Sequence, residues 1–188
     1  LLTARVALLS HDHTGFRTDV TAASAWTRQY FDTRTKPVQA LIAAIAAKPL
    51  IDRFGLKGSV YTTLQALSGA GPTGVPGMYV VDNVLPFIQD EEEKLRNELA
   101  KILGTYENGA ITPHPAPLSA TCTRVPVLEG HTETVNVSLD HAATVDDVKR
   151  AFRDHGRSFL ALGLPSAPPA LIDVSEDPFR PQPRLDRD

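Results

Sequence analysis

Two short alternating runs joined by a bend place the strongest constraint on what this chain can fold into. β-Branched or apolar side chains occupy every second position in residues 123–127 and again in residues 135–139. Because a period of two is typical of strands with one buried face, both runs are predicted as half-buried strands. Pro126 has no backbone N–H to donate, so the first run is expected at a sheet edge or a strand end. Gly130 gives the backbone the freedom to reverse, and the pattern therefore predicts a domain built on a sheet.

Two chemically capable side chains flank this bend. Arg124 and His131 lie seven residues apart, one on each side of it. A planar guanidinium can hold a carboxylate with two parallel hydrogen bonds, and an imidazole can transfer a proton near neutral pH. The alternatives are an arginine in a surface ion pair and a histidine without a role. The pair together favours a site for an anionic substrate with proton transfer.

Composition narrows the function classes. The chain has 188 residues, 42% hydrophobic and 22% charged, which is ordinary for one soluble globular domain or two small ones. A net charge of −3 argues against a nucleic-acid partner, which would need a basic stripe. The longest apolar run, residues 40–47, is much shorter than the ~20 residues that cross a bilayer, so no membrane partner is expected. The single cysteine excludes an internal disulfide and fits a reducing compartment, so a cytoplasmic location is expected.

Four histidines raise the question of a zinc site. His11 and His13 are close in sequence, and His114 and His131 could join them. Nothing fixes these side chains at a recognised ligand spacing. No metal site is therefore predicted.

Helical and strand patterns alternate along the rest of the chain and indicate a mixed α/β or α+β domain. Pro37 suits the first turn of a helix that Gly55 would close, and Thr144 is a suitable helix cap with Asp147 at the third position. The expected elements are helices near 38–54, 91–103 and 145–154, a strand at 59–64, a loop at 68–77, and loop or extended structure over 163–188.

Polar residues near two of these elements are further candidates. Glu91 and Lys94 lie three residues apart on one face at a predicted helix start, where free N–H groups favour a phosphate. The acidic run around Glu91 could instead serve only to compensate the helix dipole. Gln65 follows the predicted strand and precedes the Ser68-Gly69 loop, which lacks the ending of a mononucleotide-binding loop.

The segment CTRVPVLEGHTE resembles the histidine motif of aspartate-semialdehyde dehydrogenases, in the branch typical of fungi and some archaea. Other stretches agree in order and spacing, so that the resemblance covers about residues 46–188. They are KPLIDRFG at 48–55, QALSGAG at 65–71, EEEK at 91–94 running to KILG at 101–104, GLPSAP at 163–168 and PQPRLDRD at 181–188.

The resemblance implies a fold and an assembly. It is similar to the carboxy-terminal catalytic and dimerisation domain of the glyceraldehyde-3-phosphate-dehydrogenase-like fold, an α/β (α+β) domain with a mixed sheet packed against helices. That domain is expected over residues 37–188, with residues 1–36 as an unmatched, weakly patterned segment. The family also has an amino-terminal Rossmann half and a segment that follows the PQPRLDRD motif, so the chain is expected to be a fragment truncated at both ends. A homo-oligomer, dimer or tetramer, is implied.

The resemblance also implies a reaction, the conversion of aspartyl phosphate to the semialdehyde with NADP as cofactor and a cysteine thioester. His131 matches the acid/base histidine, and Arg124 matches the arginine that holds the substrate's α-carboxylate. Lys94 would bind phosphate. Glu91 would hold the substrate ammonium, with Glu92 or Glu93 as open alternatives.

Three further positions complete the implied site. Gln65 would orient the substrate, while Ser68 and Gly69 belong to the loop that approaches the nicotinamide. All three fall in the QALSG stretch.

One departure from the family pattern concerns the nucleophile. The family's cysteine stands at the start of the helix that carries KPLIDRFG, but residues 37–42 here read PVQALI, without Cys, Ser or Thr. Cys122 matches a non-catalytic position, and a lone thiol on a strand is usually a packed residue. The chain alone is therefore expected to be inactive, and the alternative function is a non-catalytic dimerisation or anion-binding relative.

Overall fold

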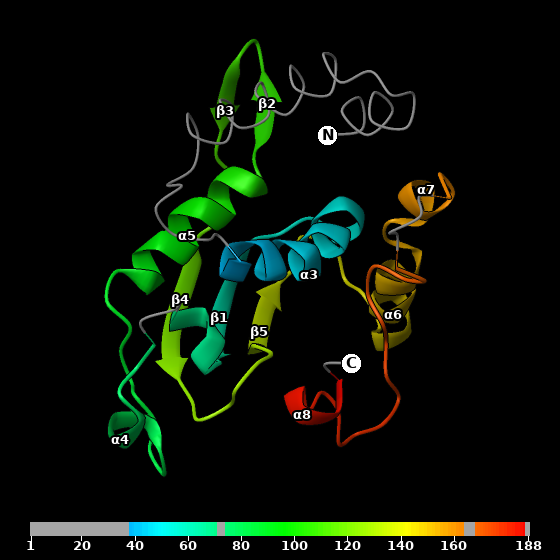
Figure 1. The fold of residues 1–188 in the computed structure, drawn as a ribbon. Helices are drawn as coiled ribbons and strands as arrows, with labels where there is room; N and C mark the ends of the chain where they lie inside the picture. The colour runs from blue at the N-terminus through cyan, green and yellow to red at the C-terminus, as the bar shows by residue number, and fades with distance from the viewer. Residues whose placement is uncertain (1–37, 71–73, 164–167, 187–188) are drawn as a thin grey trace, which may run out of the picture. The chain divides into compact units, whose positions relative to one another are not determined.

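A computed structural model describes residues 38–70, 74–163 and 168–186 (Figure 1). The elements in chain order are α3 (Val38–Phe54), β1 (Gly58–Gln65), the 3-10 helix η1 (Leu67–Ala70), α4 (Gly77–Val80), α5 (Glu91–Ile102), β2 (Thr105–Glu107), β3 (Ala110–Thr112), β4 (Leu118–Arg124), β5 (Thr132–Ser138), α6 (Val145–Asp154), α7 (Arg157–Leu160) and α8 (Pro183–Asp186).

The main sheet has the strand order β4-β1-β5 and is mixed, with β1 parallel to β4 and antiparallel to β5. The register pairs Gln65 at the end of β1 with Arg124 at the end of β4, and Leu64 with Thr132 at the start of β5. These three strand ends therefore meet at one end of the sheet. The bend of residues 125–131 crosses this end, because it connects β4 to β5 on opposite sides of β1.

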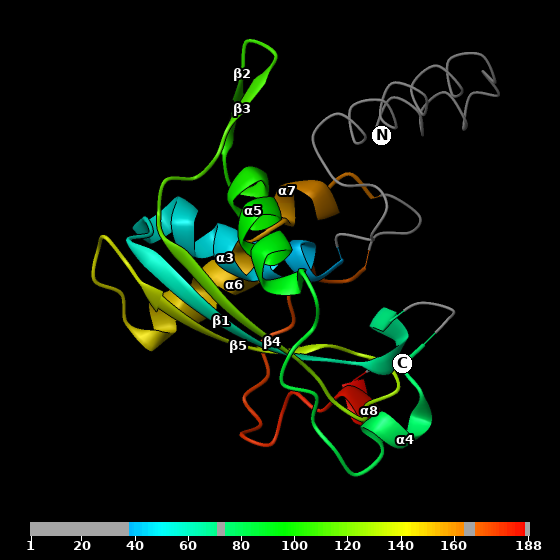
Figure 2. The same ribbon diagram turned by 90° about the vertical axis from the view of Figure 1, so that its left-hand side faces the viewer.

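One face of the sheet carries the hydrophobic core. Alternate residues of β1, from Ser59 to Gln65, are buried, and α3 and α5 lie against this face (Figures 1 and 2). Small side chains on α3 let that helix approach closely, while α5 contributes leucines. The buried cluster consists of Ala40, Ala43, Ala44, Ala47, Tyr61, Leu95, Leu99, Leu103 and Cys122.

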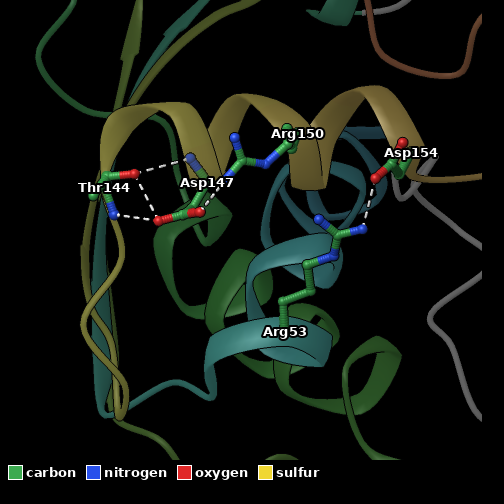
Figure 3. Close-up of polar contacts among 5 residues, drawn as sticks. All are labelled: Arg53, Thr144, Asp147, Arg150 and Asp154. Atoms are coloured by element: carbon green, nitrogen blue, oxygen red, sulfur yellow. Dashed lines mark hydrogen bonds and ion pairs between the residues drawn. The ribbon is translucent and has the colours of Figure 1, made fainter.

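Helix α6 is fixed at both ends by polar contacts (Figure 3). The Thr144 hydroxyl accepts a hydrogen bond from the Asp147 N–H at 3.2 Å, and the Asp147 carboxylate accepts one from the Thr144 N–H at 2.9 Å. This reciprocal pair confirms the predicted cap. At the other end, Arg53 of α3 forms an ion pair with Asp154 at 2.7 Å, which connects the two helices.

Several predicted elements have different bounds or were missed. The first alternating run was placed at 123–127, but β4 spans Leu118–Arg124, so the strand ends before Pro126, which cannot donate to a ladder. The hairpin β2–β3 was not predicted, because three-residue strands are too short to show a period. α4 and α8 are single helical turns inside stretches predicted as loop or extended structure.

Three further expectations concern the amino-terminal segment, a membrane span and a metal site. The segment 1–36 and its boundary at residue 37 lie outside the described residues, as do His11 and His13. Among the residues that the structure describes, no helix is both long and apolar enough to cross a membrane. The same residues include no group of three or more His, Cys, Asp or Glu side chains that could hold a metal ion.

Candidate functional site

Arg124 occupies the last position of β4, where it faces the buried side of the sheet. Its Nη1 donates a hydrogen bond to the Ala66 carbonyl at 2.7 Å. On the free edge of β4, the Arg124 backbone exchanges two hydrogen bonds with Leu85, at 2.9 and 3.0 Å. Burial lowers the pKa of the Arg124 guanidinium, and the nearby Glu91 carboxylate opposes that change. The guanidinium is thus a cation held by the Ala66 carbonyl, on a strand end whose own backbone is paired with Leu85.

His131 follows the bend and points back toward the same backbone segment. Its Nδ1 accepts a hydrogen bond from the Ala66 N–H at 2.9 Å. An acceptor nitrogen carries no proton, so the neutral ring is protonated at Nε2. Burial lowers the pKa of His131, the positive charge of Arg124 lowers it further, and the charge of Glu91 opposes both. At neutral pH the ring is therefore an uncharged proton donor through Nε2.

Gly69 in η1 lies between these two side chains. A Cβ at this position would be 2.9 Å from Arg124 Nη1 and 2.9 Å from His131 Cε1. The turn that carries Gly69 is held to the bend by hydrogen bonds from the Leu67 and Ser68 N–H groups to carbonyls of residues 127 and 128, at 2.8 and 3.0 Å. A glycine is needed here because both functional groups approach its backbone. Ser68 and Gly69 are themselves exposed beside them.

Gln65 and Glu91 complete the contacts around this point. Gln65 is buried at the end of β1, and its Nε2 donates to Glu91 Oε1 at 3.3 Å and to Thr63 Oγ1 at 3.4 Å. Of the three acids at the start of α5, Glu91 is the one that contacts Gln65. Glu92 instead accepts from the Cys122 N–H at 3.1 Å, and Glu93 is exposed.

The predicted site residues are thus brought together to different degrees. Direct contacts connect Arg124, His131 and Gly69 through Ala66, and Gln65 with Glu91. Lys94 is half-buried one turn after Glu91 on α5. It is therefore placed near the site only through its position on that helix.

Cys122, the single cysteine of the chain, is fully buried on β4 within the hydrophobic core. Burial raises the pKa of its thiol, and the carboxylates of Glu91, Glu92 and Glu133 raise it further. A thiol that is buried and protonated cannot serve as the attacking group.

Sequence reasoning missed Glu133, which lies two residues after His131. Its carboxylate accepts a hydrogen bond from the Gln39 amide at the start of α3, and burial raises its pKa to about 7. A period of two places Glu133 on the same side of β5 as Val135, which packs against the core, and this was the available signal. The contact joins β5 to the helix start where the resemblance implies a nucleophile.

Comparison with known proteins identifies the family of the chain. Residues 47–188 match the family model described as semialdehyde dehydrogenase, dimerisation domain. The chain belongs to this family. The motif resemblance described for the sequence is thereby confirmed.

Individual relatives are enzymes of one kind. The aspartate-semialdehyde dehydrogenase of Archaeoglobus fulgidus is 45% identical over 148 residues, covering 79% of this chain and 42% of that protein. That of Methanothermobacter thermautotrophicus is 43% identical over 155 residues, covering 82% and 45%. The Candida albicans enzyme is 45% identical over 150 residues, covering 75% and 41%. This chain therefore spans less than half the length of these relatives.

A solved structure gives the same assignment. The crystal structure of aspartate semialdehyde dehydrogenase with NADP from Candida albicans matches with a TM-score of 0.70 and 40% identity, covering 79% of this chain and 43% of that one. The predicted fold class, a mixed sheet packed with helices as in the dimerisation domain, is confirmed.

Proposed function

We propose that this chain provides the substrate-binding and proton-transfer groups of an NADP-dependent aspartate-semialdehyde dehydrogenase. The observation that carries the proposal is the position of Arg124 and His131 on either side of Gly69. A fixed cation and a neutral imidazole are held there by the backbone of one residue, Ala66. The substrate class is that of the similar aspartate-semialdehyde dehydrogenases.

The charges of the site match those of an aspartyl substrate. Arg124 uses one N–H group on Ala66 and keeps others to hold the α-carboxylate. Glu91, already close to Arg124 and His131, binds the α-ammonium, and Gln65 orients the carboxylate of Glu91 through its amide. Lys94 binds the phosphate from the next turn of α5. We assign Glu91 rather than Glu92 or Glu93 because it alone of the three contacts Gln65.

His131 moves the proton through Nε2. The Ala66 N–H occupies Nδ1, so Nε2 carries the proton of the neutral ring and can donate a hydrogen bond to an oxygen that gains charge. Formation of the imidazolium would place two N–H groups against each other at Nδ1. With the Ala66 contact formed, the ring therefore suits an uncharged hydrogen-bond donor, and full proton transfer, first as a base and then as an acid, requires that contact to open.

The residues present fit the nicotinamide end of the cofactor. Gly69 is exposed and has no side chain to block a ring that approaches its backbone beside His131 and Arg124, and exposed Ser68 lies next to it. When bound, NADP supplies the hydride chemistry of the reaction. The sheets in the described part of the chain have three and two strands, and neither provides a doubly wound cofactor-binding fold.

A second candidate function is a non-catalytic anion-binding relative. It is favoured by the PVQALI stretch at the start of α3 and by the buried, protonated state of Cys122. Under either reading the chain by itself gives no turnover with NADP. Turnover that Cys122→Ser abolishes would contradict this expectation.

We further propose that the chain self-associates as a homo-oligomer and works in the cytoplasm. Support for self-association comes from the outward face of β1, where Val60 and Leu64 are exposed, and from the dimerisation domain that the chain matches. A single, reduced cysteine supports the compartment.

A titration of this chain with L-aspartate and with inorganic phosphate, followed by NMR, tests the site. Charge-assisted hydrogen bonds contribute about 1.5–3 kcal/mol each when shielded, and less in an open cleft. Weak binding of about millimolar Kd is expected, with shifts centred on His131 and Gly69. Arg124→Ala should abolish it. Arg150→Ala, which removes an exposed arginine from α6, is the matched control and should leave binding unchanged. Equal binding by both variants would contradict the proposed function.

A further inference from the structure

Glu133 is a titratable side chain on the core side of the sheet, and the proposed reaction does not use it. It pairs with Thr63 of β1, which pairs in turn with Cys122 of β4, so the three residues form one row across the sheet. The Glu133 carboxyl accepts a hydrogen bond from Nε2 of Gln39, the second residue of α3. This contact connects the strand that follows His131 to a helix start 94 residues earlier in the chain.

The Gln39 side chain also has a buried hydrogen-bond acceptor without a donor. Gln39 is only 5% exposed, and its Oε1 has no hydrogen-bond partner in the part of the chain that the structure describes. Buried polar atoms in folded proteins almost always have a partner. An ionised Glu133 cannot supply one, because a carboxylate only accepts hydrogen bonds, whereas the neutral acid carries one O–H donor. The unpaired amide oxygen therefore requires a proton on Glu133.

The surroundings of Glu133 favour the neutral acid. Burial, with no opposing charge from the described residues, raises the pKa of Glu133 to about 7. Helix α3 adds no charge near its start, because residues 38–47 contain no ionisable side chain. The titratable groups on the neighbouring elements are Tyr61 on β1, Cys122 and Arg124 on β4, Glu91 and Glu92 on α5, and His131 before β5.

These neighbours do not hold Glu133 as a carboxylate. Burial raises the pKa of Tyr61 and of Cys122, so both are uncharged at neutral pH. The guanidinium of Arg124 donates to the Ala66 carbonyl. The acids of α5 add only negative charge, which also disfavours a second carboxylate.

We propose that neutral Glu133 donates its O–H to Gln39 Oε1 and so closes a clamp of two hydrogen bonds between β5 and the start of α3, which opens when this proton is released. The bond from Gln39 Nε2 is the first of the two. Loss of the proton removes the second and leaves two acceptor oxygens facing each other without a donor, which is costly in a buried place. Glu133 itself is half-buried, so solvent can take up the proton. The clamp is therefore a pH-sensitive switch that is closed below about pH 7 and open above it.

The clamp acts on the candidate site through its two ends. Glu133 lies two residues after His131, and Gln39 belongs to the PVQALI stretch, where the resemblance implies the attacking group. The closed clamp fixes this helix start relative to the strand that follows the acid/base histidine. Glu133 is thus a positioning residue that touches no substrate. The inference needs no bound ligand, so it goes beyond the proposed function and does not depend on it.

Hydrogen exchange of the whole chain, followed by NMR between pH 6 and 8, tests the clamp. The protection factors of the N–H groups in the first two turns of α3 report its opening, free of the intrinsic pH dependence of exchange. Protection should fall about tenfold over this range, as linkage gives for a carboxyl with a pKa of about 7 in the closed state and 4.5 in the open state. The start of α6 is an internal reference and should keep constant protection. Its cap uses Asp147, whose pKa is lowered by hydrogen bonds from Thr144.

Two variants separate the clamp from a contact that is only structural. Glu133→Gln replaces the O–H donor by an N–H donor that does not titrate, so protection of α3 should be high and independent of pH. Gln39→Ala removes both partner atoms and should lower protection at pH 6 about tenfold, to the wild-type level at pH 8. Glu129→Gln removes an exposed acid from the preceding bend and is the matched control, which should keep the wild-type pH dependence. Circular dichroism of every variant verifies that folding is retained.

The Gln39 amide also gives a direct spectroscopic signature. Its Cδ and side-chain N–H resonances should titrate with the same apparent pKa as the Glu133 carboxyl, because the O–H···O bond exists only while Glu133 is protonated. Gln39 resonances that do not follow Glu133, or wild-type α3 protection that stays constant between pH 6 and 8, overturn the proposal. A Glu133→Gln variant that keeps the wild-type pH dependence also overturns it. Arg124→Ala should lose anion binding and keep the pH dependence of α3, which distinguishes failure of this proposal from failure of the proposed function.

Discussion

Replacement of Gly69 by alanine should disable the site while leaving the fold intact. The new methyl group would be 2.9 Å from both Arg124 Nη1 and His131 Cε1, closer than real Cβ contacts permit. One of the two groups must therefore move by several tenths of an ångström. Neither is free to do so, because each already holds a hydrogen bond to Ala66, at 2.7 and 2.9 Å.

The energetic cost follows from those two bonds. Loss of the neutral bond to His131 costs about 0.5–1.5 kcal/mol, and loss of the charged bond from Arg124 about 1.5–3 kcal/mol. The histidine contact is the weaker and should yield first. Alanine also reduces the freedom of the unfolded chain, which offsets about 0.4–1 kcal/mol. The net change in the free energy of unfolding should therefore be small, about 1 kcal/mol or less, whereas anion affinity should fall at least about tenfold.

Two measurements check this prediction. Urea denaturation gives the stability change, and an NMR titration gives the pKa of His131, which should rise toward the ordinary value of about 6.5 once the ring leaves the Ala66 N–H. Gly77→Ala is the matched control, because a Cβ there meets nothing within 4 Å and Gly77 has no positive φ. If Gly69→Ala retains the wild-type affinity and His131 pKa, the assignment of a shared site around Gly69 is wrong.

Two further predictions concern stability. The pKa of Glu133 is raised to about 7 in the folded chain, so the stability that this group contributes is fully present below the unfolded pKa of 4.5 and is lost as pH rises through 7. Glu133→Gln should therefore flatten the pH dependence of the free energy of unfolding between pH 4.5 and 7, and stabilise the chain at pH 8 by at most about 3 kcal/mol. Glu129→Gln, at an exposed position in the preceding bend, is the control and should change neither quantity. An unchanged pH profile in Glu133→Gln would refute the interpretation of Glu133 as a buried acid. Thr144→Ala removes the hydroxyl that accepts from the Asp147 N–H, keeps the backbone N–H that donates to the Asp147 carboxylate, and should cost about 1 kcal/mol in urea denaturation. Unchanged stability would mean that this contact is not formed in solution.

Much of the fold follows from local patterns in the sequence. The helices at the predicted 38–54, 91–103 and 145–154 agree closely with α3, α5 and α6, because apolar spacing, caps and glycines act within a few residues. The strand order could not be predicted in this way. β1 enters between β4 and β5, and this pairing depends on contacts between residues more than fifty positions apart.

The candidate site could likewise be predicted only in part. Its side chains could be named from their chemistry and from the family motifs. Their partners could not, because the groups that hold Arg124 and His131 are backbone atoms of Ala66, which no side-chain pattern reveals. The raised pKa of Glu133 was also hidden, since it depends on how completely α3 covers β5.

The backbone of Ala66 is the shared hydrogen-bond partner of the two functional side chains, His131 and Arg124. The Ala66 N–H holds the His131 imidazole and its C=O holds the Arg124 guanidinium. A shift of Ala66 therefore displaces both side chains together and preserves the distance between them. Side-chain substitutions at position 66 leave both backbone groups in place. Proline alone among the standard residues removes the N–H and retains the carbonyl, so it is the one exchange that could release the histidine while the arginine stays anchored.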